Sequence, residues 1–242
     1  MALSVHTLRA AAHRAVPPGL CAVCRDWCQR AVCEPCLQRF APLRPRCAHC
    51  ARVLPAALPR CGECMSTASE FGACLTGADY ADPWDQLIAG FKFHRKTELA
   101  AALCELLLRA VRETGRDARP ALLLPVPLSR ERLRERGYNQ AWELARRLSR
   151  RLDVAARADV LQRSRDTPHQ IGMTRAEREH NLRDAFWIEP RQRYRLQGMH
   201  VALVDDVFTT GATAHAAALA LTRAGAARVD VWVVARTPLG DE

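Results

Sequence analysis

Eight of the eleven cysteines in this chain form four Cys-x2-Cys pairs. Two thiolates three positions apart on a tight turn can bind one ion, and two such turns complete a tetrahedral zinc site. The eight candidate ligands are Cys21, Cys24, Cys33, Cys36, Cys47, Cys50, Cys61 and Cys64. The spacing therefore predicts two structural Zn²⁺ ions in tandem zinc ribbons. Four thiolates leave no coordination position open for water, so we do not expect zinc to be the catalyst.

The spacing leaves the pairing open. The simpler arrangement is one in which consecutive pairs share a zinc ion. A cross-braced form, in which the first and third pairs share a zinc ion, also fits. Disulfides, free thiols or an iron-sulfur cluster fit four such turns less well. We interpret Cys28, Cys74 and Cys104, which fall outside the pattern, as structural thiols. Since metal supplies most of a ribbon's folding free energy, replacing Cys21 or Cys61 should unfold the front module without removing ligand binding elsewhere.

A second candidate site lies in residues 201–213, Val-Ala-Leu-Val-Asp-Asp-Val-Phe-Thr-Thr-Gly-Ala-Thr. An apolar strand delivers Asp205 and Asp206 at its carboxyl end, and a loop of small and hydroxyl residues then opens a helix. Backbone N–H groups, threonine hydroxyls and the positive helix end could hold a phosphate dianion, with Gly211 permitting a close approach. No lysine follows the glycine, so this is not the ATPase P-loop. An ordinary strand, turn and capped helix is the alternative.

Strands and helices alternate through the segments that must position this site. Helices are expected after Thr97, ending near Gly115, and over 139–148 and 212–224; strands are expected over 121–126, 200–204 and 228–235. The polar stretch 165–183 is expected to be a long loop. Such alternation favours a parallel, doubly wound α/β sheet, in which ligands bind beyond the carboxyl ends of the strands.

Residues 201–213 resemble the 5-phosphoribosyl 1-diphosphate (PRPP) binding motif of the type I phosphoribosyltransferases. By that resemblance, Asp205 and Asp206 accept hydrogen bonds from the ribose 2′ and 3′ hydroxyls. The resemblance assigns the 5′-phosphate to Thr209, Thr210, Gly211, Ala212 and Thr213.

The order of the motifs resembles the ComF family of competence-linked proteins. After the cysteine pairs come Phe91-Lys-Phe-His-Arg95, Pro125-Val-Pro-Leu128, Arg136-Gly-Tyr-Asn-Gln140, Asp166-Thr-Pro-His-Gln-Ile-Gly172, Arg178-Glu-His-Asn181 and the PRPP motif. The resemblance implies a double zinc ribbon joined to a type I phosphoribosyltransferase-like sheet with flanking helices, and a link to DNA uptake or use. We divide the chain into an N-terminal helix or arm (1–20), the double zinc ribbon (21–70) and the phosphoribosyltransferase-like domain (75–242).

If PRPP binds, its diphosphate needs a second loop. The turn after the strand ending at Val126 is the best candidate, and its expected contacts are Pro127, Leu128, Ser129, Arg130 and Arg136. By resemblance, the polar loop closes over PRPP, with Gln170, Arg178 and Asn181 as lid contacts. Mg²⁺ would accompany the diphosphate. No residue stands out as a general base, so catalytic residues stay unassigned.

Charge points to a polyanionic partner. The net charge is +10, and residues 130–195 hold 17 arginines against 10 acidic residues. We expect single-stranded DNA to bind there, with competence-machinery proteins such as a DNA helicase or translocase as further partners. A GC-rich genome could also account for the arginines. No apolar run is long enough for a membrane span and no secretion signal is evident, so a cytoplasmic protein is expected.

Two functions from different classes fit these features. One is an enzyme that transfers phosphoribosyl between PRPP and a nucleobase or nucleotide. The other is a non-catalytic single-stranded DNA-binding factor that senses PRPP or a nucleotide. We assign no role to His94, His169, His180 or His215. The aromatic residues Trp84, Phe91 and Phe93 are expected to pack in the core rather than stack on bases.

Overall fold

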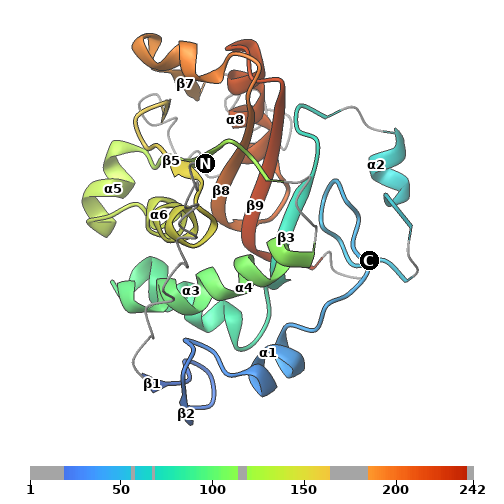
Figure 1. Cartoon of the computed structure of the whole chain (residues 1–242), viewed down its shortest axis with the longest axis vertical. Coiled ribbons are helices and arrows are strands. Elements are labelled where there is room, and N and C mark those ends of the chain that lie inside the picture. Colours follow the sequence, from blue (N-terminus) through green and yellow to red (C-terminus); the bar gives the residue numbers. More distant parts are fainter. Residues whose placement is uncertain (1–18, 56–57, 67–68, 114–118, 164–184, 239–242) are drawn as a thin grey trace, which may run out of the picture.

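The computed structural model describes residues 19–55, 58–66, 69–113, 119–163 and 185–238. At its centre is a five-stranded parallel sheet with the strand order β3-β9-β8-β4-β5 (Figure 1). Its strands are β3 (Cys74–Asp79), β4 (Leu122–Pro125), β5 (Ala155–Ala156), β8 (His200–Phe208) and β9 (Arg228–Arg236). The predicted parallel α/β sheet is confirmed.

Helices cover both faces of this sheet. On one face, Ala202 and Val204 of β8 share a core with α3 (Trp84–Phe93), α4 (Ala100–Glu113) and α6 (Gln140–Leu152). On the other face, Val201 and Leu203 share a core with α8 (Ala212–Arg223). Because both faces are covered, β8 is a nearly continuous apolar run up to the carboxylates.

Smaller elements complete the described part of the chain from β3 onward. They are the short helix α5 (Arg130–Arg136), the 3₁₀ turns η1 (Thr97–Leu99) and η3 (Pro190–Leu196), and the antiparallel pair β6 (Leu161–Arg163) and β7 (Phe186–Ile188). The pair β6–β7 lies with α8 on the same side of the sheet.

The expected helices and strands are present among the described residues, but some boundaries differ, and the helix expected over 139–148 continues to Leu152. The helix end expected near Gly115 and the loop expected over 165–183 lie outside the described residues. The strand predicted over 200–204 continues to Phe208, because β9 pairs with β8 as far as the Phe208–Arg236 register. Asp205 and Asp206 therefore lie within the last part of the strand rather than just after it. The helix expected after Thr97 begins as η1 and continues as α4 to Glu113. Sequence patterning did not identify β3 or α3.

The cysteine-rich segment has little regular structure. It contains β1 (Gly19–Leu20), β2 (Trp27–Cys28), α1 (Glu34–Phe40) and α2 (Gly62–Ser66). Figure 1 shows β1, β2 and α1 below α3 and α4, whereas α2 lies beside β3. The division of the chain into 1–20, 21–70 and 75–242 stays a prediction, and most of 1–20 lies outside the described residues.

A search of the described helices for a bilayer-spanning segment found none that is both long and apolar enough. The expected cytoplasmic location stays a prediction.

Candidate functional site

The cysteines form two groups of four. We call Cys21, Cys24, Cys33 and Cys36 the first cysteine module, and Cys47, Cys50, Cys61 and Cys64 the second cysteine module. Within each module the four sulfur atoms lie within 4.8 Å of one another. The consecutive pairing is therefore confirmed, and the cross-braced arrangement is not the one observed.

The sulfur positions fit a tetrahedral ion. Zinc–sulfur bonds of about 2.3 Å place the sulfurs of a tetrahedron about 3.8 Å apart. The Sγ atoms of Cys24 and Cys33 are 3.7 Å apart, and those of Cys50 and Cys61 are also 3.7 Å apart. Both modules therefore can hold a metal ion, and four thiolates are the ligand set that structural zinc sites use.

The backbone around each module favours a thiolate. Burial acts to raise the pKa of Cys21, but backbone N–H groups, that of Cys33 foremost, outweigh it and lower the pKa to about 6. Burial likewise opposes ionisation of Cys47, while the N–H groups of Cys50 and Cys61 help to lower its pKa to about 7. The N–H of Cys33 lies 3.4 Å from Cys21 Sγ, and that of Cys61 lies 3.3 Å from Cys47 Sγ. Such N–H donors to ligand sulfur support the ligands from outside the metal shell.

The carboxylates of β8 meet a lysine that the sequence did not single out as a site residue. Lys92 Nζ of α3 lies 2.7 Å from Asp206 Oδ1, and the Asp206 side chain is only 4% exposed. The other oxygen, Asp206 Oδ2, is buried without a hydrogen-bond partner among the described residues. A buried acceptor without a partner costs about 1–3 kcal/mol, so a donated hydrogen bond from a hydroxyl would be favourable here.

The Asp205 carboxyl group, next to Asp206 on β8, is a weaker acid than an exposed aspartate because its pKa is raised. Burial raises its pKa to about 7, and the neighbouring Asp206 charge adds to the effect. The backbone N–H of Asp206, 2.9 Å from Asp205 Oδ1, acts in the opposite direction, as do the charges of Lys92 and Arg136. Near neutral pH this carboxyl group therefore exists in both protonation states.

The loop after β8 makes a tight turn into α8. Gly211 has φ +83°, a left-handed conformation that favours glycine, and it precedes the first residue of α8. A Cβ atom on Gly211 would lie 2.5 Å from Phe208 Cζ, so a side chain here would also displace the Phe208 ring. Thr209 and Thr210 are exposed, and Ala212 and Thr213 are half-buried. The Thr210 hydroxyl accepts a hydrogen bond from the Ala212 N–H at 3.4 Å, at the start of α8.

The predicted diphosphate loop lies next to this site. Strand β4 pairs with β8 in the register Pro125–Val204, and the Val126 N–H donates to the Val204 carbonyl at 2.9 Å. The turn therefore leaves the sheet beside Asp205. In the turn, Pro127 and Leu128 are half-buried and Arg130 is exposed. The Ser129 hydroxyl caps α5 by accepting from the Arg132 N–H at 3.3 Å.

The Arg136-to-Gln140 motif packs against the end of α3. The Arg136 guanidinium lies 5.2 Å from the centre of the Phe93 ring, and the Tyr138 hydroxyl donates to the Phe91 carbonyl. Trp84 and Phe91 are buried, as expected, but Phe93 is 65% exposed, so the prediction of a core position was wrong for it. Phe93 follows Phe91 by two residues, which on a helix turns its side chain to the opposite side.

The predicted lid residues Gln170, Arg178 and Asn181 lie outside the described residues. The assigned roles of Asp205, Asp206, Thr209, Thr210, Gly211, Ala212, Thr213, Pro127, Leu128, Ser129, Arg130 and Arg136 stay predictions. The structure brings the turn after β4 and the turn after β8 to one edge of the sheet, and it places Lys92 against Asp206. Lys92 lies 113 residues before Asp205 in the chain, so no local sequence motif could link the two residues.

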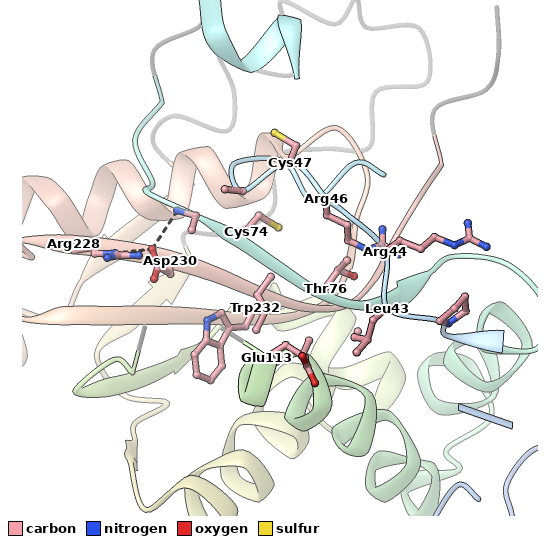
Figure 2. Close-up of a pocket in the computed structure, with 16 residues that line it drawn as sticks. Leu43, Arg44, Arg46, Cys47, Cys74, Thr76, Glu113, Arg228, Asp230 and Trp232 are labelled. Atoms are coloured by element: carbon pink, nitrogen blue, oxygen red, sulfur yellow. Dashed lines mark hydrogen bonds and ion pairs between the residues drawn. The ribbon is translucent and has the colours of Figure 1, made fainter. Parts of the chain in front are cut away.

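A cavity of about 320 Å³ lies at a different place (Figure 2). It is lined by the first residues of β3 and β9, by the end of α4 and by the segment from Pro42 to Ala48. Asp230 on its wall is already bound by Arg228, His200 and the Ala73 N–H. The cavity therefore lies toward the amino ends of the strands, away from the carboxylates of β8.

Comparisons with known proteins agree with this geometry. Residues 139–241 match the family model of the phosphoribosyl transferase domain. The DNA utilization protein YhgH of Escherichia coli (strain K12) is 38% identical over 233 residues, which cover 91% of this chain and 98% of that protein. The chain belongs to the ComF family. Competence protein F of Haemophilus influenzae is 33% identical, over 85% of this chain and 90% of that protein.

Other likenesses are weaker. Competence protein ComFC of Bacillus subtilis is 30% identical over 65% of this ComF-family chain and 62% of that protein. A solved allosteric regulatory enzyme of purine biosynthesis has a TM-score of 0.37 and 19% identity, covering 56% of this chain and 26% of that one. That structural likeness adds nothing to the family assignment. The fold class is confirmed for this ComF-family chain by its sheet, by the matched domain and by its two four-cysteine groups.

Proposed function

We propose that this chain binds PRPP with Mg²⁺ at the carboxyl edge of β4 and β8, and acts in the use of DNA during competence. The observation that carries the proposal is the pair of carboxylates on β8, directly before a glycine turn into a helix. One of their oxygens is buried and has no hydrogen-bond partner among the described residues. Hydroxyl donors and a phosphate are the chemistry that such a site accepts together. The names of the relatives, DNA utilization protein and Competence protein F, support the setting.

Each part of PRPP has a candidate partner. Asp205 and Asp206 accept from the ribose hydroxyls, and the turn from Thr209 to Thr213 takes the 5′-phosphate. The turn from Pro127 to Arg130, with Arg136, faces the Mg²⁺-bound diphosphate. Gln170, Arg178 and Asn181 stay predicted lid contacts. When bound, Mg²⁺ neutralises charge that develops on the leaving diphosphate.

The reaction that fits is phosphoribosyl transfer. The bond between ribose C1 and the diphosphate oxygen breaks, and pyrophosphate leaves with the electron pair. A bond from C1 to a nucleobase nitrogen forms, and the proton of that nitrogen is released to solvent. The protein's contribution is to hold the ribose and to exclude water. In this proposal the two cysteine modules bind structural zinc, which fixes their turns and takes no part in the chemistry.

Calorimetry with Mg²⁺ and PRPP tests the site. We expect binding by the wild-type protein, and a loss of about 3–6 kcal/mol in the double variant Asp205→Asn, Asp206→Asn, since two charge-assisted hydrogen bonds are removed. Asp159→Asn, at an exposed ion pair, is the control and should bind like the wild type. Unchanged affinity in the double variant would mean that the motif does not hold the ribose.

Turnover separates the enzyme from a non-catalytic sensor. Pyrophosphate release that depends on an added nucleobase supports transfer, whereas PRPP binding without release supports a sensing role. The observation that favours a DNA-binding factor as the second candidate is the basic surface beside the site. Arg130 and Arg134 of α5 are exposed, and the Phe93 ring is exposed next to Arg136.

Single-stranded DNA should then bind mainly through charge. A footprint of a few phosphates predicts a slope of log affinity against log salt of roughly −2 to −4. Poly-pyrimidine and mixed strands should bind within about tenfold of each other. Anisotropy titrations at two salt concentrations, with and without Mg²⁺ and PRPP, measure this. Absence of binding at moderate salt would remove DNA as a direct ligand and leave the PRPP proposal standing.

A further inference from the structure

The second cysteine module lies against the end of β8, which leads into residues 209–213. We call these residues the phosphate loop, after the role proposed for them above. Arg236, at the end of β9, is 6% exposed, and its guanidinium joins the module to the end of β8. Its Nε donates to the carbonyl of Cys50 at 2.9 Å, and its terminal nitrogen donates to the carbonyl of Phe208 at 3.3 Å. A metal-ligand residue of the module and the last residue of β8 therefore share one buried side chain.

Phe208 passes this contact on to the loop. The Arg236 guanidinium lies 5.0 Å from the centre of the Phe208 ring. The same ring also packs against Gly211, where a Cβ atom would lie in the space that the ring occupies. Interiors packed at this density transmit a displacement from one group to its neighbour. A shift of Phe208 therefore changes the turn that Gly211 makes.

A second contact runs from the same module to the first turn of α8. His49, between two metal ligands, stacks on Phe71 with ring centres 4.5 Å apart and an interplanar angle of 14°. Phe71 also contacts the His215 ring at 4.7 Å and the Phe208 ring edge-on at 6.2 Å. His215 Nδ1 lies 2.7 Å from Glu70 Oε2. The N-terminal turn of α8 is thus held from the side of the second cysteine module.

The first cysteine module is joined to other elements through α1, which contains Cys36, and through the residue that follows this helix. Arg109 of α4 donates to the carbonyls of Leu37 and Ala41, at 3.2 and 2.8 Å, and Trp84 Nε1 donates to the Phe40 carbonyl at 2.7 Å. These bonds join the module to α3 and α4. None of them reaches Phe208 or Gly211.

We propose that the second cysteine module supports the phosphate loop, and that Arg236 is the positioning residue that transmits this support to Phe208 and Gly211. This inference rests on the proposed PRPP site for its functional meaning. Its structural content, the order of residues 208–216, can be measured without ligand. Metal in the second module fixes the Cys50 carbonyl, and Arg236 then holds the end of β8 in one position.

Arg236→Met tests the inference, because methionine keeps an apolar stem of similar reach and removes the donors. The matched control is Arg109→Met, which removes the equivalent bonds to the first module. We expect amide hydrogen exchange over residues 208–216 to quicken at least tenfold in Arg236→Met, with Mg²⁺-PRPP affinity falling by tenfold or more. Arg109→Met should leave both within about twofold. Equal effects, or no effect of Arg236→Met, would overturn the inference.

A second variant decides the matter if Arg236→Met fails to fold. Phe71→Leu removes the ring between His49 and His215 and leaves all eight cysteines and Arg236 in place. It should quicken exchange in the first turn of α8 and weaken Mg²⁺-PRPP binding severalfold, and unchanged exchange there would contradict the inference. If the wild-type protein binds no PRPP, the proposed function fails, but the exchange comparison still decides whether the module supports the loop.

Discussion

The two cysteine modules have the same ligands and nearly the same spacing, but they hold different parts of the protein. The first is bound by Trp84 and Arg109 and so joins α3 and α4. The second is bound by Arg236 and, through His49, by Phe71, and so joins the end of β8 and the start of α8. The same sequence signature thus supports the outer helices in one case and the candidate site in the other.

This difference teaches that a cysteine module of this type is best understood from the residues that donate hydrogen bonds to the backbone carbonyls in and beside it. For each module one of these donors is an arginine far along the chain, Arg109 for the first module and Arg236 for the second. The position of that arginine in the sheet or helix layer decides which part of the protein depends on the metal. For the second module, this changes the expectation from sequence that the front region can unfold without affecting the ligand site.

The largest expected effect is loss of one metal site. Cys33→Ser and Cys61→Ser should each lower the zinc content from two to one per chain, as measured by elemental analysis. Structural zinc contributes on the order of 10–16 kcal/mol in isolated finger peptides, so each module should lose its fold locally. Cys61→Ser should lower the thermal midpoint of the large domain more, because β8, β9 and α8 lose a support.

A zinc content near zero in the wild type under reducing, zinc-replete conditions would rule out the zinc assignment. Equal thermal midpoints for the two variants would break the comparison between the modules.

The next largest effect concerns helix α3. Among the contacts described, this helix alone connects the first module to the candidate site. Lys92→Met leaves the buried Asp206 charge without its partner and should destabilise the protein by about 3–5 kcal/mol in urea unfolding. Lys96→Met, at an exposed position four residues further along the chain, should change stability by less than about 0.5 kcal/mol. A small effect of Lys92→Met would show that α3 does not hold the carboxylates.

A smaller effect is expected at the glycine that meets Phe208. Gly211→Ala and Gly198→Ala both place alanine at positive φ, +83° and +67°, which costs about 1–2 kcal/mol. Only at Gly211 does the new Cβ meet a ring, which adds about 1–3 kcal/mol of overpacking. Gly211→Ala should also weaken Mg²⁺-PRPP binding, and Gly198→Ala should not. Equal stability of the two variants in urea would mean that Phe208 moves aside freely.

The smallest effect belongs to Asp205, whose raised pKa comes from burial in the sheet rather than from either module. The ionised form is the better acceptor, so Mg²⁺-PRPP affinity should fall about tenfold from pH 8 to pH 6, as expected for one group with pKa near 7. Calorimetry in buffers of different ionisation enthalpy should detect proton release on binding near pH 7. In Asp205→Asn both effects should disappear.

The raised pKa of Asp205 also predicts how the stability of the folded protein changes with pH. Because the folded-state pKa lies above that of the unfolded chain, Asp205 costs stability progressively as the pH rises from about 4 to about 7. Asp205→Asn should therefore be more stable than the wild type at pH 8, and this difference should vanish near pH 4. An unchanged difference across that range would contradict the raised pKa.

The sequence predicted those parts of the structure whose residues all lie within one short segment of the chain. The cysteine pairs predicted both ligand sets, and the apolar run up to Val204 predicted a buried strand ahead of the carboxylates. The glycine-containing turn and α8 followed the expected boundaries within one residue. In each case the residues that interact are neighbours in the chain.

The contacts that sequence could not supply join distant segments. Lys92, Phe71 and Arg236 each reach the site from a separate element, and each residue type is ordinary where it stands. The prediction that Phe93 is buried was wrong because the residue type alone does not show which side of a helix end faces the core. Only the packing of α3 on the sheet decides that Phe91 is buried and Phe93 is exposed.

Hydrogen exchange over residues 208–216 in Cys61→Ser and Cys33→Ser tests the central claim most directly. The measurement needs no ligand and compares the two modules under the same conditions. We predict that exchange in this segment quickens at least tenfold in Cys61→Ser and stays within about twofold of the wild type in Cys33→Ser. Equal protection of the segment in both variants would contradict the claim that the second module supports residues 208–216.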